Sequence, residues 1–540
     1  MPAAAPPPAD LPQTCLTAGR FVDSDHPGRT CTVTLRSFTL HDLIERNAWL
    51  HGHRTAFAGD GEAITHAQYA QRAARLAAGL AGAGLAVGER VAVLAHNCQA
   101  YLDLIGAAAR LGAIVVPVNW RLSAEEVAYV LADTRPRALI VAPELLPLVA
   151  QADLQGVQKY TSGPAPGQES AAGGWLPLAS LYLESAIPAP APIEDDAGLF
   201  IVHTAAVGGR PRGALLSHRG LLTAASKSVH AFKLTPGDVQ VGVLPLFHLA
   251  GIGLTLALMA AGGATITVAR FDAGSVVTLI DEQGGSVMGS FPPMLGAVLD
   301  AAAAAGSGLG RLRVVTGIDA PETLARFAAA CPQADFWVAY GQTETSGSIS
   351  TSRYADRPGS AGLPVEQHTV AIVDDEDRPV PHGATGEIVV RGPMVFNGYW
   401  NCEADNAFTF RGGWHHTGDM GHFDADGYLW YVGRSPAKEL IKPGGENVYP
   451  AEVERALLEH PAVDQAVVFG VPDAQWGEAV QAVCVLKPGH ALAAEDLIEF
   501  VGGRIARYKK PKHVVFAPEL PRTASGGTDR AAAKARHAVA

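Results

Sequence analysis

Short, uninterrupted apolar runs constrain the fold of this chain most strongly. Residues 90–94, 113–118 and 138–141 are almost entirely apolar, and stretches long enough for helices separate them. Strands have this composition when helices cover both faces of a largely parallel sheet. We therefore predict an α/β fold with mostly parallel sheets flanked by helices.

Two helix starts in this region carry paired capping residues. Gln68 follows Thr65 by three positions, and Glu126 follows Ser123 by the same spacing. In such a pair, the first side chain accepts a hydrogen bond from the backbone N–H of the third helical residue. The side chain of that residue accepts a hydrogen bond from the backbone N–H of the first. Both positions therefore predict helix N-termini.

A polar stretch with glycine and proline near Gly433 predicts a domain boundary. Beyond it, the pattern predicts a helix over 451–459, strands over 466–471 and 479–486, and a helix over 495–507. We thus expect three segments: a partly disordered tail over 1–35, a large domain of several subdomains over 36–433, and a small mobile α+β domain over 434–540.

The charge of the chain argues against a polyanionic partner. Its 540 residues have a formal net charge of -12, and no long basic run occurs, so we predict no contact with nucleic acid. The six cysteines are scattered, and the first thirteen residues lack the pattern of a secretion signal. The expected location is therefore cytoplasmic.

One uncharged stretch, residues 249–269, is about long enough to cross a bilayer. It contains four glycines, at positions 251, 253, 262 and 263. These favour a buried helix followed by a strand over 264–268, and we predict no integral membrane contact.

The segment over 413–454 has the most specific pattern. It holds a carboxylate, Asp419, in a turn-rich stretch and Arg434 at the predicted boundary. Together with PLFHLAG over 245–251 and YGQTE over 340–344, it resembles the adenylate-forming superfamily of AMP-binding enzymes. The similarity is to the acyl-CoA synthetase branch, which contains fatty-acid and aryl-acid CoA ligases.

The resemblance implies a site for ATP. Asp419 would accept hydrogen bonds from both ribose hydroxyls of ATP, and Arg434 would help to bind the ribose or the phosphates. Thr343 would bond the α-phosphate, and Glu344 would hold Mg²⁺, because a hard cation prefers carboxylate oxygens. Tyr340 would lie against the adenine. The other implied positions for nucleotide or CoA are Thr204, Gly208, Gly209, Arg212, Gly317, Gly341, Lys442, Gly444 and Gly445.

His248 lies in an apolar segment, where an isolated histidine is usually a hydrogen-bonded core residue. The resemblance implies instead a gate between acyl pocket and nucleotide. The amino-acid-activating branch has an aspartate here, so His248 favours a CoA ligase. Three further histidines, His415, His416 and His422, lack a metal-ligand pattern and are expected to be solvated.

The phosphate loop departs from the family pattern. Ala205, Val207 and Gly208 stand where hydroxyl donors are expected, and Arg212 replaces a lysine. Backbone N–H groups and the guanidinium could still bind phosphate. We therefore expect slower or weaker use of ATP.

The C-terminal motif departs as well. Gly527 replaces a lysine that, by the resemblance, reaches the carboxylate and α-phosphate during adenylation. Losing such a group costs roughly 3 to 4 kcal/mol. The hinge after Arg434 is two residues longer than usual, and we place its pivot at Lys438 or Glu439.

Two functions follow from these patterns. The first is an AMP-forming acid-CoA ligase whose substrates are a carboxylic acid, ATP and CoA. The alternative is an adenylation-defective relative that binds nucleotide or acyl-CoA, or catalyses only thiol transfer. The expected acyl pocket, over 242–256, 288–293 and 317–321, is mostly small or apolar, which favours a neutral, apolar acyl or aryl acid.

Overall fold

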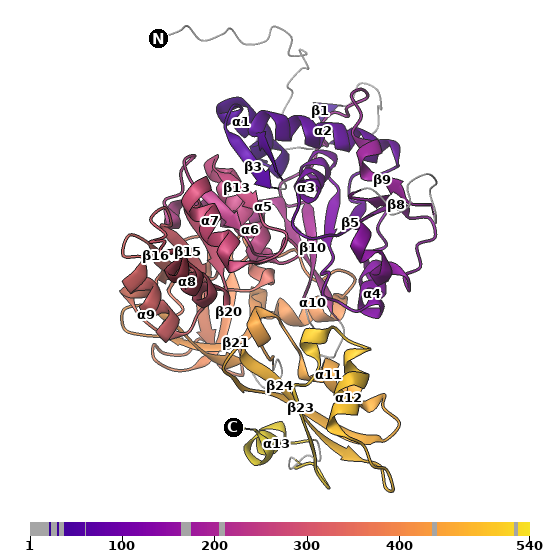
Figure 1. The fold of residues 1–540 in the computed structure, drawn as a ribbon, viewed down its shortest axis with the longest axis vertical. Coiled ribbons are helices and arrows are strands. Elements are labelled where there is room, and N and C mark those ends of the chain that lie inside the picture. The colour runs from indigo at the N-terminus through magenta and orange to yellow at the C-terminus, as the bar shows by residue number, and fades with distance from the viewer. Residues whose placement is uncertain are drawn as a thin grey trace.

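The structure is a computed structural model that describes residues 21–22, 30–31, 37–59, 61–163, 174–204, 211–434, 440–522 and 528–539. Within these ranges, five sheets and their helices form a large N-terminal part and a small C-terminal part (Figure 1). This is the predicted α/β fold with a small α+β domain. Of the predicted tail over 1–35, the structure describes one antiparallel pair, β1 (Phe21–Val22) and β2 (Thr30–Cys31).

The first large sheet has seven strands, and the three predicted apolar runs form its centre. Its strands, in spatial order, are β11 (Arg212–Ser217), β10 (Gly198–Thr204), β6 (Ile114–Pro117), β5 (Arg90–Leu94), β7 (Ala138–Val141), β8 (Gln158–Thr161) and β9 (Leu176–Pro177). All its strand pairs are parallel except β10 with β11. The predicted parallel sheet is therefore confirmed.

Helices cover both faces of this sheet. One core contains α1 (Leu40–His51), α2 (His66–Gly82) and α3 (Gln99–Leu111), and the opposite face packs on α4 (Ala124–Thr134). The capping residues of α2 and α4 exchange the predicted hydrogen bonds. Local sequence therefore determines where these two helices begin.

The second large sheet has nine strands. In spatial order they are β18 (Leu363–Pro364), β17 (Ser350–Arg353), β16 (Asp335–Tyr340), β15 (Val314–Gly317), β14 (Val287–Ser290), β12 (Val239–Gly242), β13 (Ala264–Thr267), β3 (Thr55–Gly59) and β4 (Glu62–Thr65). The strands from β16 to β3 pair in parallel, and those at the two edges are antiparallel.

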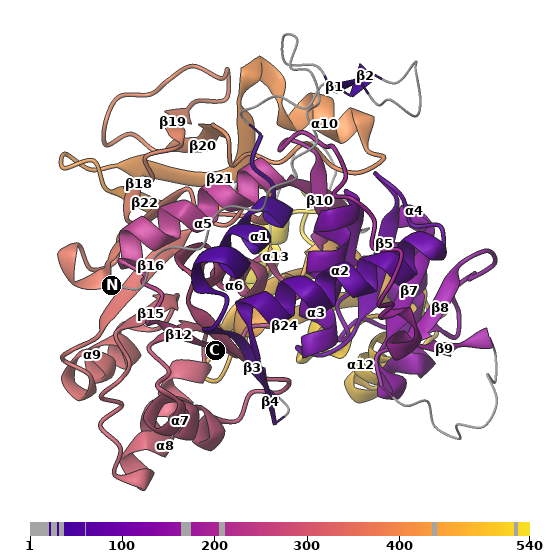
Figure 2. The same ribbon diagram turned by 90° about the horizontal axis from the view of Figure 1, so that it is seen from above.

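Two central helices, α5 (His218–Phe232) and α6 (Leu249–Ala261), lie between the two large sheets (Figure 2). On its other face the second sheet packs against α7 (Ala273–Gln283), α8 (Met294–Ala305) and α9 (Pro321–Ala330). The predicted buried helix followed by a strand is confirmed by α6 and β13. No helix in the described part of the chain is both long and apolar enough to cross a membrane.

A third, antiparallel sheet carries much of the most specific sequence block. It consists of β19 (Thr369–Val373), β20 (Gly386–Arg391), β21 (His415–Phe423) and β22 (Leu429–Arg434), and α10 (Glu403–Thr409) precedes β21. Asp419 and Arg434 face each other across the β21–β22 hairpin. Two residues fifteen positions apart in the sequence are thus neighbours in space.

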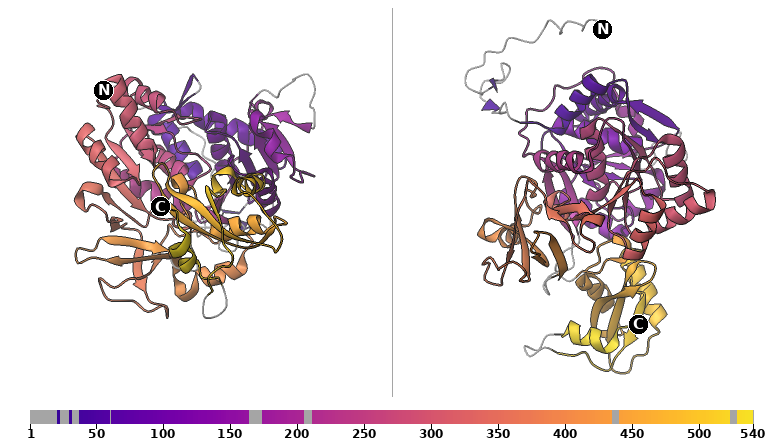
Figure 3. Two further views of the ribbon diagram at one scale, coloured as in Figure 1. Left: turned by 60° about the horizontal axis from the view of Figure 1, so that its bottom comes forward. Right: turned by 90° about the vertical axis from the view of Figure 1, so that its left-hand side faces the viewer.

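The small domain is built on β23 (Val463–Asp473), β24 (Gly477–Leu486) and β25 (His513–Phe516). One face of this sheet packs on α11 (Pro450–Leu458) and α12 (Ala494–Gly502), and the other on α13 (Arg530–His537). Figure 3 shows this domain projecting from the large part. The prediction of a helix over 495–507 was wrong at its C-terminal end. The helix stops at Gly502, because Gly502 and Gly503 disfavour its continuation.

Candidate active site

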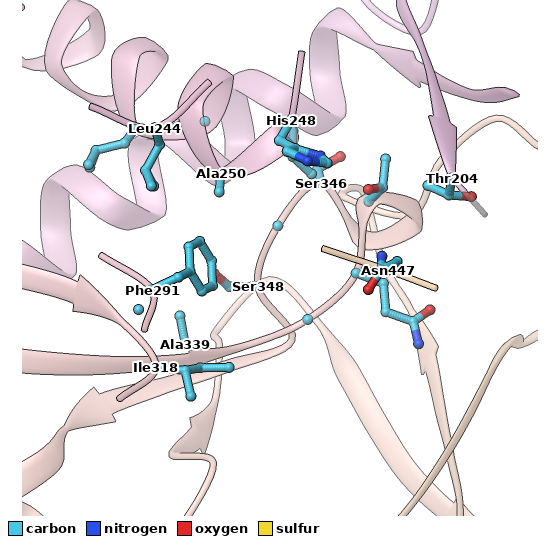
Figure 4. A pocket seen from close by; sticks show the side chains of 18 of the residues that line it. Thr204, Leu244, His248, Ala250, Phe291, Ile318, Ala339, Ser346, Ser348 and Asn447 are labelled. Atoms are coloured by element: carbon cyan, nitrogen blue, oxygen red, sulfur yellow. The ribbon is translucent and has the colours of Figure 1, made fainter. Parts of the chain in front are cut away.

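A cavity of about 350 Å³ lies between the two large sheets, the β21–β22 hairpin and the small domain. Its ends differ in chemistry (Figure 4). The polar end is lined by Thr204, Arg212, Gln342, Thr343, Glu344, Arg434, Lys442, Gly444, Glu446, Asn447 and Tyr449. The apolar end is lined by Ala224, Lys227, Ser228, Phe232, Leu244, Ala250, Gly253, Leu254, Phe291, Met294, Ile318 and Ala339.

Asp419 is held just behind the polar end. It is 1% exposed, and its Oδ2 accepts from the Tyr340 hydroxyl at 2.8 Å and from Gln342 Nε2 at 2.7 Å. Arg434 Nε lies 3.2 Å from Oδ1, but the angle does not make a hydrogen bond, so Oδ1 is without a hydrogen-bond partner. A buried carboxylate oxygen in this state is suited to accept a ligand hydroxyl.

The ion pair also fixes the charge of Arg434. Burial is the largest single influence and would lower the pKa of this guanidinium, but the Asp419 carboxylate and the neighbouring tyrosines together outweigh burial and raise the pKa. Arg434 lines the cavity, whereas neither Asp419 nor Tyr340 contributes to its wall. The Tyr340 ring lies 5.7 Å from the Tyr431 ring. The contact of Tyr340 with adenine stays a prediction.

Glu344 is a buried carboxylate at the cavity wall. Its Oε1 accepts from the Tyr399 hydroxyl at 2.8 Å and from Thr204 Oγ1 at 3.3 Å. No hydrogen bond from the described residues reaches Oε2. Burial, followed by the Glu344 charge, raises the pKa of Tyr399 well above 10, so this phenol stays a donor. A carboxylate oxygen that accepts no hydrogen bond from the protein is available to bind a hard cation such as Mg²⁺.

The ends of the phosphate loop meet at this point. Thr204 and Arg212 are paired across β10 and β11, which brings both to the polar end. The Arg212 guanidinium lies 3.9 Å from the centre of the Tyr399 ring and 3.2 Å from Asp405. Residues 205–210, which include the predicted Gly208 and Gly209, lie outside the described residues.

Two predicted glycines form narrow parts of the wall. A Cβ at Gly341 would lie 2.1 Å from the carbonyl oxygen of Gly347, and one at Gly317 would lie 1.8 Å from that of Ser290. Both glycines line the cavity. Only glycine permits this close approach of the backbone segments.

The small domain closes the polar end through the loop over 442–449. Glu446 accepts from His248 Nε2 at 3.2 Å and is paired with Arg121. Burial would raise the pKa of Glu446, but the charges of His248 and Arg121 outweigh it and hold the pKa at about 2. Lys442 and Gly444 line the cavity, and their binding roles, like that of Gly445, stay predictions.

His248 stands at the junction of the two ends. It precedes α6 with an extended backbone, and its ring lies 4.5 Å from that of Phe247. The bond to Glu446 joins it to the small domain. Its predicted role as a gate stays a prediction, with a partner that the sequence did not indicate.

A second interdomain contact lies outside the cavity. Lys509 Nζ donates to Glu126 at 2.5 Å and to Glu452 at 2.6 Å, and all three side chains are buried. Burial would raise the pKa of Glu126, but the Lys509 charge lowers it. A cation between two carboxylates stabilises this orientation of the small domain, because removing one partner leaves a buried charge uncompensated.

The expectation of solvated histidines was wrong for His415 and His416, which are buried in β21. His416 Nδ1 is hydrogen-bonded to Glu387 at 2.9 Å. The potential ligand atoms of His416, Glu387 and Asp377 lie within 4.8 Å of one another, which is close enough to hold a metal ion. Arg411 is already paired with Asp377 and Glu387. The group is therefore accounted for as an ion-pair cluster.

Sequence reasoning missed several residues of the site. They include Arg121, Lys227, Gln342, Tyr399 and Asn447. Gln342 lies inside the YGQTE segment and could have been found there, as could Asn447, which directly follows the loop over 442–446 that was expected to approach CoA. Arg121, Lys227 and Tyr399 carry no local signal, because tertiary packing alone brings them to the cavity.

Comparison with known proteins defines the family. A family model described as "AMP-binding enzyme" matches residues 44–400, and one described as "AMP-binding enzyme C-terminal domain" matches 452–526. The chain belongs to the AMP-binding enzyme family. The predicted boundary at 433/434 falls between the two matched regions and stays a prediction.

Two curated relatives of this AMP-binding enzyme are named as a CoA ligase and a CoA synthase. The chain is 37% identical over 498 residues to indoleacetate–CoA ligase of Aromatoleum aromaticum, covering 90% of this chain and 96% of the relative. It is 35% identical over 489 residues to feruloyl-CoA synthase of an Amycolatopsis species, covering 89% and 95%.

Solved structures agree with the fold. A putative long-chain-fatty-acid CoA ligase of Rhodopseudomonas palustris is 49% identical with a TM-score of 0.70, covering 74% of this chain and 100% of that one. o-Succinylbenzoate CoA synthetase of Bacillus subtilis is 26% identical with a TM-score of 0.79, covering 92% and 98%.

Proposed function

We propose that this protein is an AMP-forming acid-CoA ligase that acts on an aryl or alkyl carboxylic acid, with ATP and CoA as co-substrates. The observation that carries the proposal is the cavity's division into a polar and an apolar end. A nucleotide and the reacting carboxylate suit the polar end, and an acyl group suits the apolar end. The relatives named as indoleacetate and feruloyl ligases support an acid with an aromatic ring.

In the first half-reaction, a carboxylate oxygen attacks the α-phosphorus of ATP, and pyrophosphate leaves as acyl-AMP forms. Asp419, with its unfilled Oδ1, would accept a ribose hydroxyl. Thr343 and Arg434 line the polar end and would donate hydrogen bonds to phosphate oxygens. Glu344 would hold Mg²⁺ through its free Oε2, and the ion would neutralise charge on the phosphates.

In the second half-reaction, the CoA thiol sulfur attacks the acyl carbon and AMP leaves, while the thiol proton is released. The present orientation of the small domain supports this step, because it directs the loop over 442–449 at the cavity. None of the described residues after Tyr449 lines the cavity. Leu520 and α13 pack on the face of the small-domain sheet opposite α11 and α12. Gly527 itself lies outside the described residues.

The alternative function is thiol transfer without adenylation, and Gly527 in place of a lysine favours it. Two assays separate the alternatives. A ligase releases AMP and forms a CoA thioester from acid, ATP and CoA, whereas the alternative forms the thioester only from supplied acyl-AMP. Gly527→Lys should raise adenylation and barely change thiol transfer. A protein that makes a thioester by neither route contradicts both functions.

We further propose a cytoplasmic location. Four cysteines, Cys98, Cys331, Cys402 and Cys484, are free thiols in the described part of the chain, which suits a reducing compartment. The net charge of -12 supports the expectation that nucleic acid is not a partner. Fractionation of the producing cells followed by activity assays would test the location.

A further inference from the structure

Lys227 is a buried cation in the wall of the apolar end. Its side chain belongs to α5 and lines the cavity on the same helical face as Ala224 and Ser228. The residue is 7% exposed, and its Nζ lies 5.9 Å from the centre of the Phe232 ring. Among the described residues, no carboxylate forms an ion pair with it.

An unpaired ammonium in such a place is costly, because burial removes its water. Burial is the cause that lowers the pKa of Lys227 from 10.5 to about 8, so the side chain is still mostly protonated at pH 7. Proteins seldom bury lysine without a partner. A partner that arrives with the substrate accounts for the arrangement.

The position of Lys227 indicates which part of a substrate it meets. Its cavity-lining neighbours on α5 are Ala224, Ser228 and Phe232, and Phe232 packs with Leu254 of α6. Lys227 would therefore meet the part of the acid that these mostly apolar side chains contact.

We propose that Lys227 determines substrate specificity by binding a polar acceptor at the far end of the acid, such as a phenol oxygen, a carbonyl or a second carboxylate. This inference rests on the proposed ligase function and narrows its substrate class. The preferred acid has an apolar body with an acceptor distal to the reacting carboxylate. The apolar lining expected from the sequence is thus interrupted by one cation.

The test compares matched acids in the full-length protein. CoA thioester formation is measured with 3-phenylpropanoic acid and with its para-hydroxy and para-carboxy derivatives. The wild type should favour at least one substituted acid over the parent by about 10- to 100-fold in kcat/KM, the range for a hydrogen bond to a charged group. Lys227→Met should abolish this ratio while turning over the parent acid, and Lys227→Arg should retain part of it.

Lys233→Met is the matched control, because Lys233 is exposed at the end of the same helix. It should leave every ratio unchanged. A wild type that treats all three acids within twofold overturns the inference, as does a ratio that survives Lys227→Met. Absence of thioester from every acid, with wild type and all variants, would instead contradict the ligase function itself.

Discussion

At the polar end of the cavity, several charged side chains are paired within the protein, whereas the charged residue at the apolar end has no such partner among the described residues. Arg434 lies against Asp419, and Glu446 lies between His248 and Arg121. Lys227 faces only apolar and neutral groups among the described residues that line its end.

The two ends of the cavity therefore differ in whether their charges are paired before a substrate binds. The polar end is preorganised, since its charges are positioned before a ligand arrives and leave specific oxygens unfilled. The apolar end is completed by its substrate, because the cost of burying Lys227 is offset only when an acceptor enters. We expect mutations at the polar end to affect every acid, and mutations at the apolar end to affect some acids more than others.

The largest effect should come from Glu344→Gln at the polar end. The amide removes the charge that would hold Mg²⁺ and oppose phosphate charge, so adenylation should slow by about 100- to 1000-fold with every acid. Acid-dependent pyrophosphate release measures this rate. Glu322→Gln, at an exposed position on α9, is the control and should change nothing. A loss confined to some acids would contradict the division between the two ends.

Asp419→Ala should weaken ATP and AMP binding by about 1.5 to 3 kcal/mol, because a charged acceptor for the ribose is lost. Isothermal calorimetry measures both affinities without any acid present. Asp426→Ala removes an exposed carboxylate from the same hairpin and serves as the control. Unchanged affinity in Asp419→Ala would remove this residue from the nucleotide site.

Gly253→Leu should shorten the apolar end. Gly253 lines the cavity on α6, and a Cβ there would meet no atom within 4 Å, so a new side chain would extend into open space. We expect ring-bearing acids to lose about 10- to 100-fold in kcat/KM, while propionate changes by less than threefold. Gly82→Leu, at an exposed helical position, controls for helix propensity. Equal losses for long and short acids would show that Gly253 does not face the acyl group.

A smaller effect should appear in the pH profile of substrate preference. Burial lowers the pKa of Lys227 to about 8, so its protonated fraction falls as pH rises through that value. The preference for acids with a distal acceptor should therefore decline by up to about tenfold between pH 7 and 9. Glu446, with a pKa of about 2, stays ionised over this range, and His368, with a pKa of about 4, stays neutral. A preference that is flat across pH 7 to 9 would contradict the role of the ammonium.

The sequence by itself determined the features that depend on neighbouring residues. Thr65 and Ser123 start helices because their bonds reach only three residues along the chain. The apolar run over 138–141 forms a central strand because its composition suits burial on both faces. The segments containing Glu344 and Asp419 indicated the polar end because the residues there follow one another in recognisable order.

Only the tertiary structure decided which distant side chains meet. Lys509 and Glu126 are 383 positions apart, and Arg121 and Glu446 are 325 apart, so no local pattern joins them. Lys227 reads in the sequence as one cation on an amphipathic helix, which usually faces water. Because the Lys227 face of α5 is covered by the rest of the large domain, this side chain is buried and faces the cavity instead. Burial depends on what covers a helix, and the covering strands come from remote parts of the chain.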